Sequence, residues 1–431
     1  MRARGRDLVD ACHAGRVDAV LSLIAHGADA DEGGDIWHDS TALMVASARG
    51  HVACVRALLD ARAAVDRATT AGTTALMYAS RGGHADCVHT LLCAGAAVDR
   101  AKEGGWTALA LGSRAGRVGC VRALLRARAA VNRARGGSGA TALMYACQGG
   151  HTDCARALLG AGALADRAKA NGATALMVAS VEGRVNCVRA LLRARAAVDM
   201  AMAGGVTALA AASEYGHVDC AAALLRARAD VNGASGSGHT PLVRARRHLR
   251  VLQLLCAYGA RREELLSPAH PMVRDVPAEC LAWLTETRRW STALHHVEHL
   301  PTRRVRALLV AGADVSVTDG GAGDAPTPLA LALALLARSA RAHAGAQLVV
   351  DAARAWSPAT HALFPACARA RAVQLLLVGV LIARGSALPY LAPSAHALLD
   401  VWLRHVMAHA VSRGECGPEP VCMSDSQSDS E

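Results

Sequence analysis

The sequence predicts an all-α fold: a solenoid of stacked helix-turn-helix units with projecting β-hairpin or turn loops and a helical cap at the C-terminal end. Three observations predict it. A Thr-Ala-Leu or Thr-Pro-Leu triplet returns every 33 or 34 residues, and a cysteine follows each of the first six triplets in the same register. The composition has 52% apolar but only 3% aromatic residues, which suits thin layers of helices packed through Ala, Leu and Val.

The two repeated markers define the length of one unit. The triplet begins at Thr41, Thr74, Thr107, Thr141, Thr174, Thr207 and Thr240. The cysteine stands at Cys54, Cys87, Cys120, Cys154, Cys187 and Cys220, with a Leu-Leu pair shortly after it. A fixed period of this length is typical of a solenoid, because one unit cannot bury its own apolar face and must stack on its neighbours.

Within one unit, residues 41–66, the apolar spacing predicts two short helices. The first begins at Thr41 and ends at Gly50, and the second contains Cys54. Residues 67–73 lack apolar periodicity and include a glycine, so they should form a turn that reaches away from the helices.

The unit resembles that of the ankyrin-repeat family, which has a Thr-Pro-Leu-His helix start, a Gly-His turn and a Leu-Leu second helix. Thr240-Pro241-Leu242 keeps the family's proline, while Ala replaces Pro in the other units and Met replaces the histidine in four of them. The turn is kept at Gly50-His51, Gly83-His84, Gly150-His151 and Gly216-His217. The resemblance implies an ankyrin fold and a role in binding other proteins.

One position departs from the family pattern at a physical cost. Where the family has glycine after the second helix, this chain has Arg62, Arg128, Arg195 and Arg228 in four units. If the backbone there keeps left-handed dihedral angles, each arginine costs roughly 1–2 kcal/mol relative to glycine.

The repeat pattern also divides the chain into segments. After Thr240 the next Thr-Ala-Leu begins 52 residues later, at Thr292, so an insert should separate two groups of units. We expect an N-terminal capping unit at 1–36, seven regular ankyrin repeats at 37–265, a helical insert at 266–290, divergent ankyrin repeats at 291–350, a C-terminal helical cap or docking element at 351–411 and a disordered acidic Ser-rich tail at 412–431.

The sequence offers little catalytic chemistry. The cysteines recur at the distance of packed helices, about 10 Å, and so cannot surround one zinc ion. The segment His295-His296-Val297-Glu298-His299 matches a zinc-protease motif, but the resemblance assigns His295 to the family's helix start. We find no phosphate-binding loop and no nucleophile with a neighbouring base, and therefore expect a non-enzymatic protein without metal or cofactor.

The predicted site is a row of cationic side chains on the turns, on the concave face that the turns form with the first helices. Its residues are Arg67, Arg100, Arg133 and Arg167, extended by Lys102, Arg135 and Lys169, with Trp37 and Trp106 as aromatic anchors. An acidic protein segment fits this face best. Nucleic acid is disfavoured because no series of aromatic side chains is present for base stacking.

An alternative function rests on the C-terminal segment. The pattern from Leu388-Pro389 to Val411 is vaguely similar to the start of an F-box, and ankyrin arrays with F-box or SOCS-box helices act as substrate adaptors of ubiquitin ligases.

The chain has a net charge of +11, and almost all of its cationic side chains are arginines. This excess reflects in part a GC-rich codon bias. No apolar stretch reaches the roughly 20 residues that span a bilayer. We expect a monomer inside the cell, in cytoplasm or nucleus.

Overall fold

The computed structural model describes residues 2–32, 39–262, 265, 275–287, 290, 292–317, 326–338, 343–353, 361–363 and 368. The chain forms two compact units, Met1–Val251 and Leu252–Glu431, which are described separately below. The cap or docking element at 351–411 lies almost wholly outside the described residues, as do the F-box-like segment and the acidic tail.

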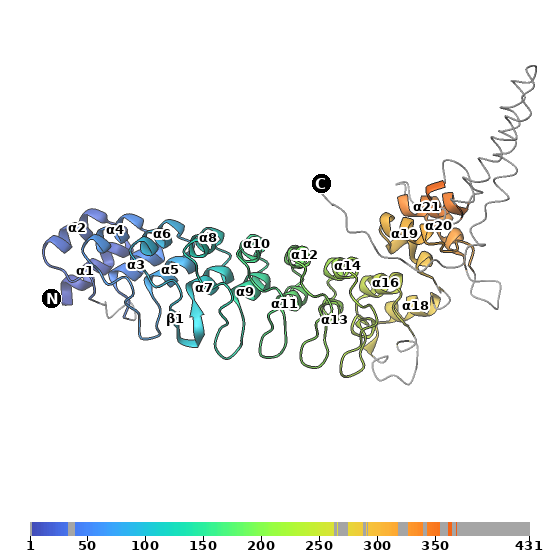
Figure 1. Ribbon diagram of the computed structural model, residues 1–431, viewed down its shortest axis with the longest axis horizontal. Coiled ribbons are helices and arrows are strands. Elements are labelled where there is room, and N and C mark those ends of the chain that lie inside the picture. The colour runs from blue at the N-terminus through green and yellow to red at the C-terminus, as the bar shows by residue number, and fades with distance from the viewer. Residues whose placement is uncertain are drawn as a thin grey trace, which may run out of the picture. The chain divides into compact units, whose positions relative to one another are not determined.

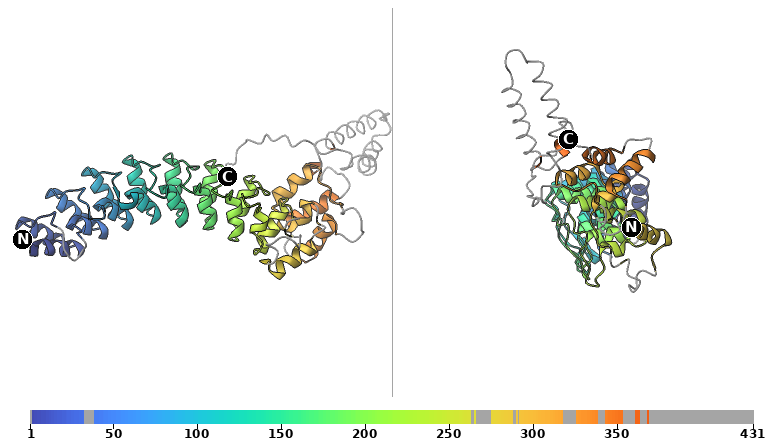
Figure 2. Two further views of the ribbon diagram at one scale, coloured as in Figure 1. Left: turned by 90° about the horizontal axis from the view of Figure 1, so that it is seen from below. Right: turned by 90° about the vertical axis from the view of Figure 1, so that its right-hand side faces the viewer.

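The first unit is a stack of helix pairs, as the sequence predicts (Figure 1). Its first helices are α1 (Arg2–His13), α3 (Ala42–Arg49), α5 (Ala75–Gly82), α7 (Ala108–Arg114), α9 (Ala142–Gly149), α11 (Ala175–Val181), α13 (Ala208–Glu214) and α15 (Pro241–Arg244). Its second helices are α2 (Val17–Ala25), α4 (Val52–Asp60), α6 (Ala85–Cys93), α8 (Val118–Arg126), α10 (Thr152–Gly160), α12 (Val185–Arg193), α14 (Val218–Arg226) and α16 (Leu249–Ala257), whose first residues lie in this unit. Successive first helices pack side by side, and so do successive second helices (Figure 2).

The repeated threonine begins each first helix by capping it. At Thr41 the hydroxyl oxygen accepts a hydrogen bond of 3.4 Å from the amide of Met44, and the six later threonines do the same three residues ahead. This bond satisfies an amide that has no partner inside the helix. The triplet is therefore a helix start in every unit, which confirms that prediction.

The Gly-His turn joins each helix-pair repeat of the first unit to the repeat before it. Gly50 ends α3 in the left-handed conformation, and a Cβ atom there would run into the ring of His84 from the next unit. Nε2 of the His84 ring lies 3.0 Å from the carbonyl oxygen of Ala48, near the end of α3. Where arginine replaces the histidine, the contact is kept: Arg117 Nε donates to the carbonyl of Arg81 at 3.4 Å. Each unit thus satisfies an end carbonyl of the previous first helix.

A second series of hydrogen bonds joins neighbouring repeats at the end of each second helix. The carboxylate of Asp66 accepts a bond of 3.0 Å from the amide of Ala97, about one period further on. The same bond is made by Asp31, Asp99, Asn132, Asp166 and Asp199. These side chains fix the loop geometry of each successive unit.

The core between the two helix layers is built from the marker residues. The leucines of the triplets are at most 2% exposed, and the repeated cysteines at most 1%. Ala46, Ala79 and Ala146 are fully buried, which lets neighbouring helices approach closely. Small side chains therefore fill the layers without large aromatic rings.

The predicted strain is present at four positions. Arg62, Arg128, Arg195 and Arg228 have φ angles of 63°, 60°, 59° and 66°, in the left-handed region. Gly95 and Gly162 adopt the same conformation at the same place in other units, where it costs nothing. The structure therefore keeps the turn and strains the arginine backbone instead of relaxing.

The second unit has a smaller helical core of its own. Its elements are α18 (Ala278–Glu286), the 3₁₀ segment η4 (Ala293–His299), α19 (Thr302–Val310), α20 (Pro328–Arg338), α21 (Ala344–Ala353) and η5 (His361–Leu363). Leu294, Val297, Val305 and Val349 are at most 1% exposed and belong to one cluster. None of the described helices in either unit is long and apolar enough to cross a membrane.

A partly buried arginine joins α18 to η4. Arg262 Nη1 donates to the carbonyl oxygen of Thr287 at 2.6 Å and to its hydroxyl at 3.2 Å, at the C-terminus of α18. Its other nitrogen contacts the ring of His296, and its guanidinium lies over Trp283. The helix dipole favours a cation at this end. Burial, followed by the charge of Arg262, lowers the pKa of His296 to about 2.

We expect Arg128→Gly to raise the free energy of unfolding by about 1 kcal/mol, because glycine adopts the left-handed conformation without strain. Gly95→Ala is the matched control and should lower it by a similar amount, since a Cβ there meets no atom within 4 Å and only the backbone is strained. Urea unfolding followed by circular dichroism measures both. Equal stability of all three proteins would show that the turn is unstrained.

We also expect the second unit to lose stability in mild acid. The unfolded chain takes up a proton at His296 below its ordinary pKa of 6.5, whereas the folded chain does not until about pH 2. Stability is therefore fully present above pH 6.5 and falls as the pH decreases, by about 1.4 kcal/mol at pH 5.5. His296→Gln, which keeps an acceptor for Arg262, should remove this share of the acid sensitivity in urea unfolding at pH 7.5 and 5.5. An unchanged pH dependence would contradict it.

Candidate functional site

The candidate site lies on the finger loops, the segments at 64–73, 97–106, 130–140, 164–173, 197–206 and 230–239 that connect each second helix to the next first helix. Figure 1 shows these loops projecting side by side from the lower edge of the first unit. One of them forms a short hairpin, in which β1 (Ala101–Lys102) pairs with β2 (Trp106–Thr107). Side chains at equal places in successive loops therefore form a row.

The finger arginines occupy equivalent places and two of them are held there. Arg100 Nη1 donates to the carbonyl oxygen of Asp66 at 2.9 Å, and Arg133 Nη1 donates to that of Asp99 at the same distance. Both side chains remain exposed, as do Arg67 and Arg167. Because a guanidinium has five N–H groups, one bond to the preceding unit orients it and leaves donors for a ligand.

Trp106, predicted as an aromatic anchor for a ligand, is largely buried by neighbouring side chains. It is only 9% exposed. Its ring stacks on Tyr145 with 4.6 Å between centroids, and the guanidinium of Arg135 lies 4.6 Å from the centroid of the indole. Arg114 lies 5.2 Å from the same centroid. The indole therefore packs within the array and positions cationic groups around itself.

Arg135 is held more firmly than the other cationic residues. Its Nε donates to the carbonyl oxygen of Gly104 at 3.0 Å, and its Nη1 donates to the hydroxyl of Tyr145 at 3.3 Å. Together with Trp106 these contacts bring two finger loops and the helix α9 to one point. The sequence placed Arg135 and Trp106 on one face, but it gave no sign that they touch, because they belong to different units.

A hollow of about 210 Å³ lies where the finger loops meet the first helices. Its apolar wall is formed by Met177, Val178, Val181 and Met202. Lys169, Asn171, Gln148 and Glu182 supply its polar groups. Lys169 is the predicted site residue that the structure places here. The hollow was missed by sequence reasoning because α9, α11 and α13 contribute to it from separate units.

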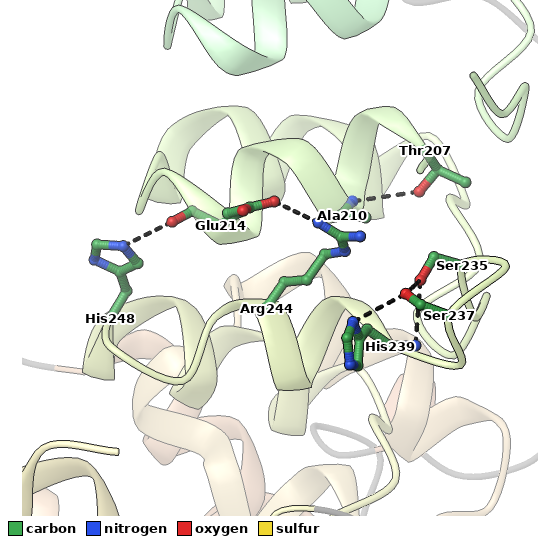
Figure 3. Close-up of polar contacts among 8 residues, drawn as sticks. All are labelled: Thr207, Ala210, Glu214, Ser235, Ser237, His239, Arg244 and His248. Atoms are coloured by element: carbon green, nitrogen blue, oxygen red, sulfur yellow. Dashed lines mark hydrogen bonds and ion pairs between the residues drawn. The ribbon is translucent and has the colours of Figure 1, made fainter. Parts of the chain in front are cut away.

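Toward the C-terminal end of the first unit, neighbouring first helices are joined by polar contacts. Arg244 on α15 forms an ion pair with Glu214 on α13 (Figure 3). His248 lies 3.0 Å from the carbonyl oxygen of Glu214, the same inter-unit contact as in the other turns. The guanidinium of Arg244 is therefore already paired within the protein.

The remaining site predictions have mixed outcomes. Lys102 is half-buried in β1, opposite Trp106. Trp37 lies outside the described residues.

The motif at His295 does not form the helix that a zinc protease needs. Residues 293–299 are a 3₁₀ segment, which places residues four apart on different faces. His295 and His296 are at most 2% exposed, and the ring of His295 contacts Thr292 at the segment start. Within the described ranges, no group of three or more His, Cys, Asp or Glu side chains lies close enough to hold a metal ion.

The repeated thiols are buried, and burial raises the pKa of Cys87, Cys120 and Cys220 to about 11. Cys187 differs, because a hydrogen bond with Cys147 lowers its pKa, but its side chain is fully buried. Cys93 is the exposed one among the described cysteines.

Comparison with known families decides the identity of the array. A sequence model of three ankyrin repeats matches residues 8–102, 62–135 and 119–202, and a model of a single ankyrin repeat matches residues 204–235. Together they cover more than half of the chain. The protein belongs to the ankyrin-repeat family. Ankyrin repeats are in general modules for protein–protein interaction. No curated protein matches the chain significantly.

We expect Trp106→Ala to lower the free energy of unfolding by about 3–5 kcal/mol, because it removes a buried indole from between two ankyrin repeats. Tyr145→Phe keeps the stacked ring and loses only the bond to Arg135, so it should lower stability by about 1 kcal/mol. Urea unfolding compares the two. A loss of less than 1 kcal/mol for Trp106→Ala would contradict the packing described here.

Proposed function

We propose that this ankyrin array is a non-enzymatic scaffold that binds an acidic protein segment along the finger loops and first helices of its first unit. The observation on which this proposal depends is the orientation of Arg100 and Arg133 by carbonyl groups of the preceding repeats. Side chains that are ordered before binding lose less entropy when a ligand arrives.

The spacing of the row suggests the form of the ligand. Packed helices in successive repeats lie about 8–10 Å apart. A peptide in the polyproline II conformation has three residues per turn and rises about 3.1 Å per residue, so every third side chain lies on the same face and advances by a similar distance. A polyproline II segment with Asp or Glu at every third position would therefore place one carboxylate beside each of Arg67, Arg100, Arg133 and Arg167.

The hollow beside Lys169 adds a second requirement. Its wall of methionine and valine side chains suits a bulky apolar side chain, and the lysine lies at its edge. We propose that the ligand has such a side chain at the end of its acidic stretch that lies near Lys169. Lys102 and Arg135 add positive charge on the finger loops between the arginine row and this hollow.

Three further assignments stay proposals from the sequence. The division at 1–36, 37–265, 266–290, 291–350, 351–411 and 412–431 is one, and the adaptor role of the C-terminal segment is another. The third is an intracellular monomer.

Random 12-residue peptides displayed on phage and selected against the full chain should be enriched in Asp and Glu. The triple variant Arg67→Ala/Arg100→Ala/Arg133→Ala should bind a selected peptide roughly 10- to 100-fold more weakly in fluorescence anisotropy, because three exposed ion pairs are lost.

The matched control is Arg56→Ala/Arg122→Ala/Arg189→Ala, which removes the same charge from exposed positions on the second helices. It should leave peptide affinity nearly unchanged. Selected peptides without acidic residues, or equal weakening by both triple variants, would contradict the proposed site.

A further inference from the structure

A second basic surface lies on the second helices, on the side of the first unit opposite the finger loops (Figure 1). The segments 120–131 and 187–198 have the identical sequence Cys-Val-Arg-Ala-Leu-Leu-Arg-Ala-Arg-Ala-Ala-Val. In both segments the core contains the cysteine, the first valine and the first leucine of the Leu-Leu pair. All three arginines of each segment are exposed. The first arginine cluster is Arg122 and Arg126 on α8 with Arg128 just after the helix end, and the second is Arg189 and Arg193 on α12 with Arg195 just after the helix end.

Backbone strain indicates that these charges are used. Arg128 and Arg195, like Arg62 and Arg228 in two other repeats, hold left-handed φ angles that glycine supplies at Gly95 and Gly162. A GC-rich codon bias does not explain the choice, because glycine codons are as rich in G and C as arginine codons. An unfavourable conformation that is kept at an exposed position points to a role for the side chain.

Among the residues that the structure describes, no arginine of either cluster forms an ion pair. The ion pairs among the described residues are Arg156–Asp153 and Arg244–Glu214, and neither includes a cluster arginine. The first turns of α8 and α12 contain no acidic residue, whereas those of α6, α10 and α14 each contain an aspartate. Each cluster is therefore a local excess of three positive charges.

The clusters are separated by a repeat of low net charge. Between them lies α10, where the charge of Arg156 is offset by Asp153 at 3.1 Å. Two repeats of packed helices span roughly 16–20 Å. The major groove of B-form DNA is about 12 Å wide, and the phosphate groups on its two edges bring the distance between the backbones into the same range.

The surface is also shaped for close approach. A hollow of about 660 Å³ lies between α6 and α8, and Arg122, Arg126 and His89 line it. Gly119 and Ala123 contribute small side chains to the same wall, and Asp86 lies at the α6 side. A phosphate backbone can thus come near the arginines of the first cluster without a steric barrier.

We propose that the two arginine clusters bind the two phosphate backbones of double-stranded DNA on either side of a groove, independently of base sequence. The helices α8, α10 and α12 contain no aromatic residue for stacking unpaired bases. None of the large apolar side chains exposed in the described residues lies on these helices, so insertion into a lipid surface has no anchor. A single extended acidic peptide would be matched better by one continuous row than by two separated clusters.

The test is a titration of the full chain against a fluorescently labelled 20-base-pair DNA duplex, followed by anisotropy between 50 and 200 mM NaCl. The informative variant is Arg128→Gly/Arg195→Gly, which removes one charge from each cluster and relieves strain at the same time. We expect binding about 10-fold weaker at 50 mM NaCl, and a salt dependence whose slope is smaller by about 2. Its urea midpoint should be higher than that of the wild type, so weaker binding does not reflect unfolding.

The control is Arg67→Ala/Arg100→Ala/Arg133→Ala, which lowers the net charge more but on the finger loops, and it should leave DNA affinity within about twofold of wild type. Equal affinity of the double variant and wild type, or no salt-dependent binding by the wild type, would overturn the proposal. So would tighter binding at the same salt to single-stranded DNA, to duplex RNA or to phosphatidylserine vesicles.

Discussion

The bonds between neighbouring repeats are the interaction on which the rest of the first unit depends. A single pair of short helices has no core of its own. Two polar contacts recur along the stack: a histidine or arginine of one repeat reaches an end carbonyl of the repeat before it, and an aspartate or asparagine accepts from an amide of the repeat after it. Both contacts satisfy groups that the short helices and loops leave without partners. Because one occurs at the turn between the two helices and the other in the loop after the second helix, they set the rotation as well as the distance between repeats.

This repeated geometry explains why one array presents two different cationic surfaces. The finger arginines project from loops whose position is fixed by the aspartate contacts, and some of them are themselves bonded to the preceding repeat. The arginines on α8 and α12 instead extend from rigid helices and from the strained residue after each helix. The first surface is a continuous row, whereas the second alternates between charged and nearly neutral repeats. The two surfaces therefore suit ligands with different charge spacing.

Much of the fold could be predicted from sequence because its determinants are local and periodic. The threonine caps, the end of the first helix at Gly50 and the left-handed arginines all follow from residues within one unit. The candidate site was harder to predict, because its contacts join different units. Trp106 was predicted as an aromatic anchor for a ligand, yet Tyr145 and Arg135, which pack against it, lie 39 and 29 residues further along the chain. The second-helix arginines were overlooked as a surface because neither amphipathic spacing nor net charge shows that they lack acidic partners.

The identical segments 120–131 and 187–198 also show a regularity over two repeats. They lie 67 residues apart, the length of two repeats, and the helix starts at Thr74 and Thr141, also 67 residues apart, share the sequence Thr-Ala-Leu-Met-Tyr-Ala. Both identities therefore recur at a distance of two repeats. In a solenoid, copying a block of two repeats reproduces every surface feature at a fixed translation, because each repeat stacks on the last with the same bonds. A second arginine cluster at a set distance from the first therefore requires no packing that the first does not already use.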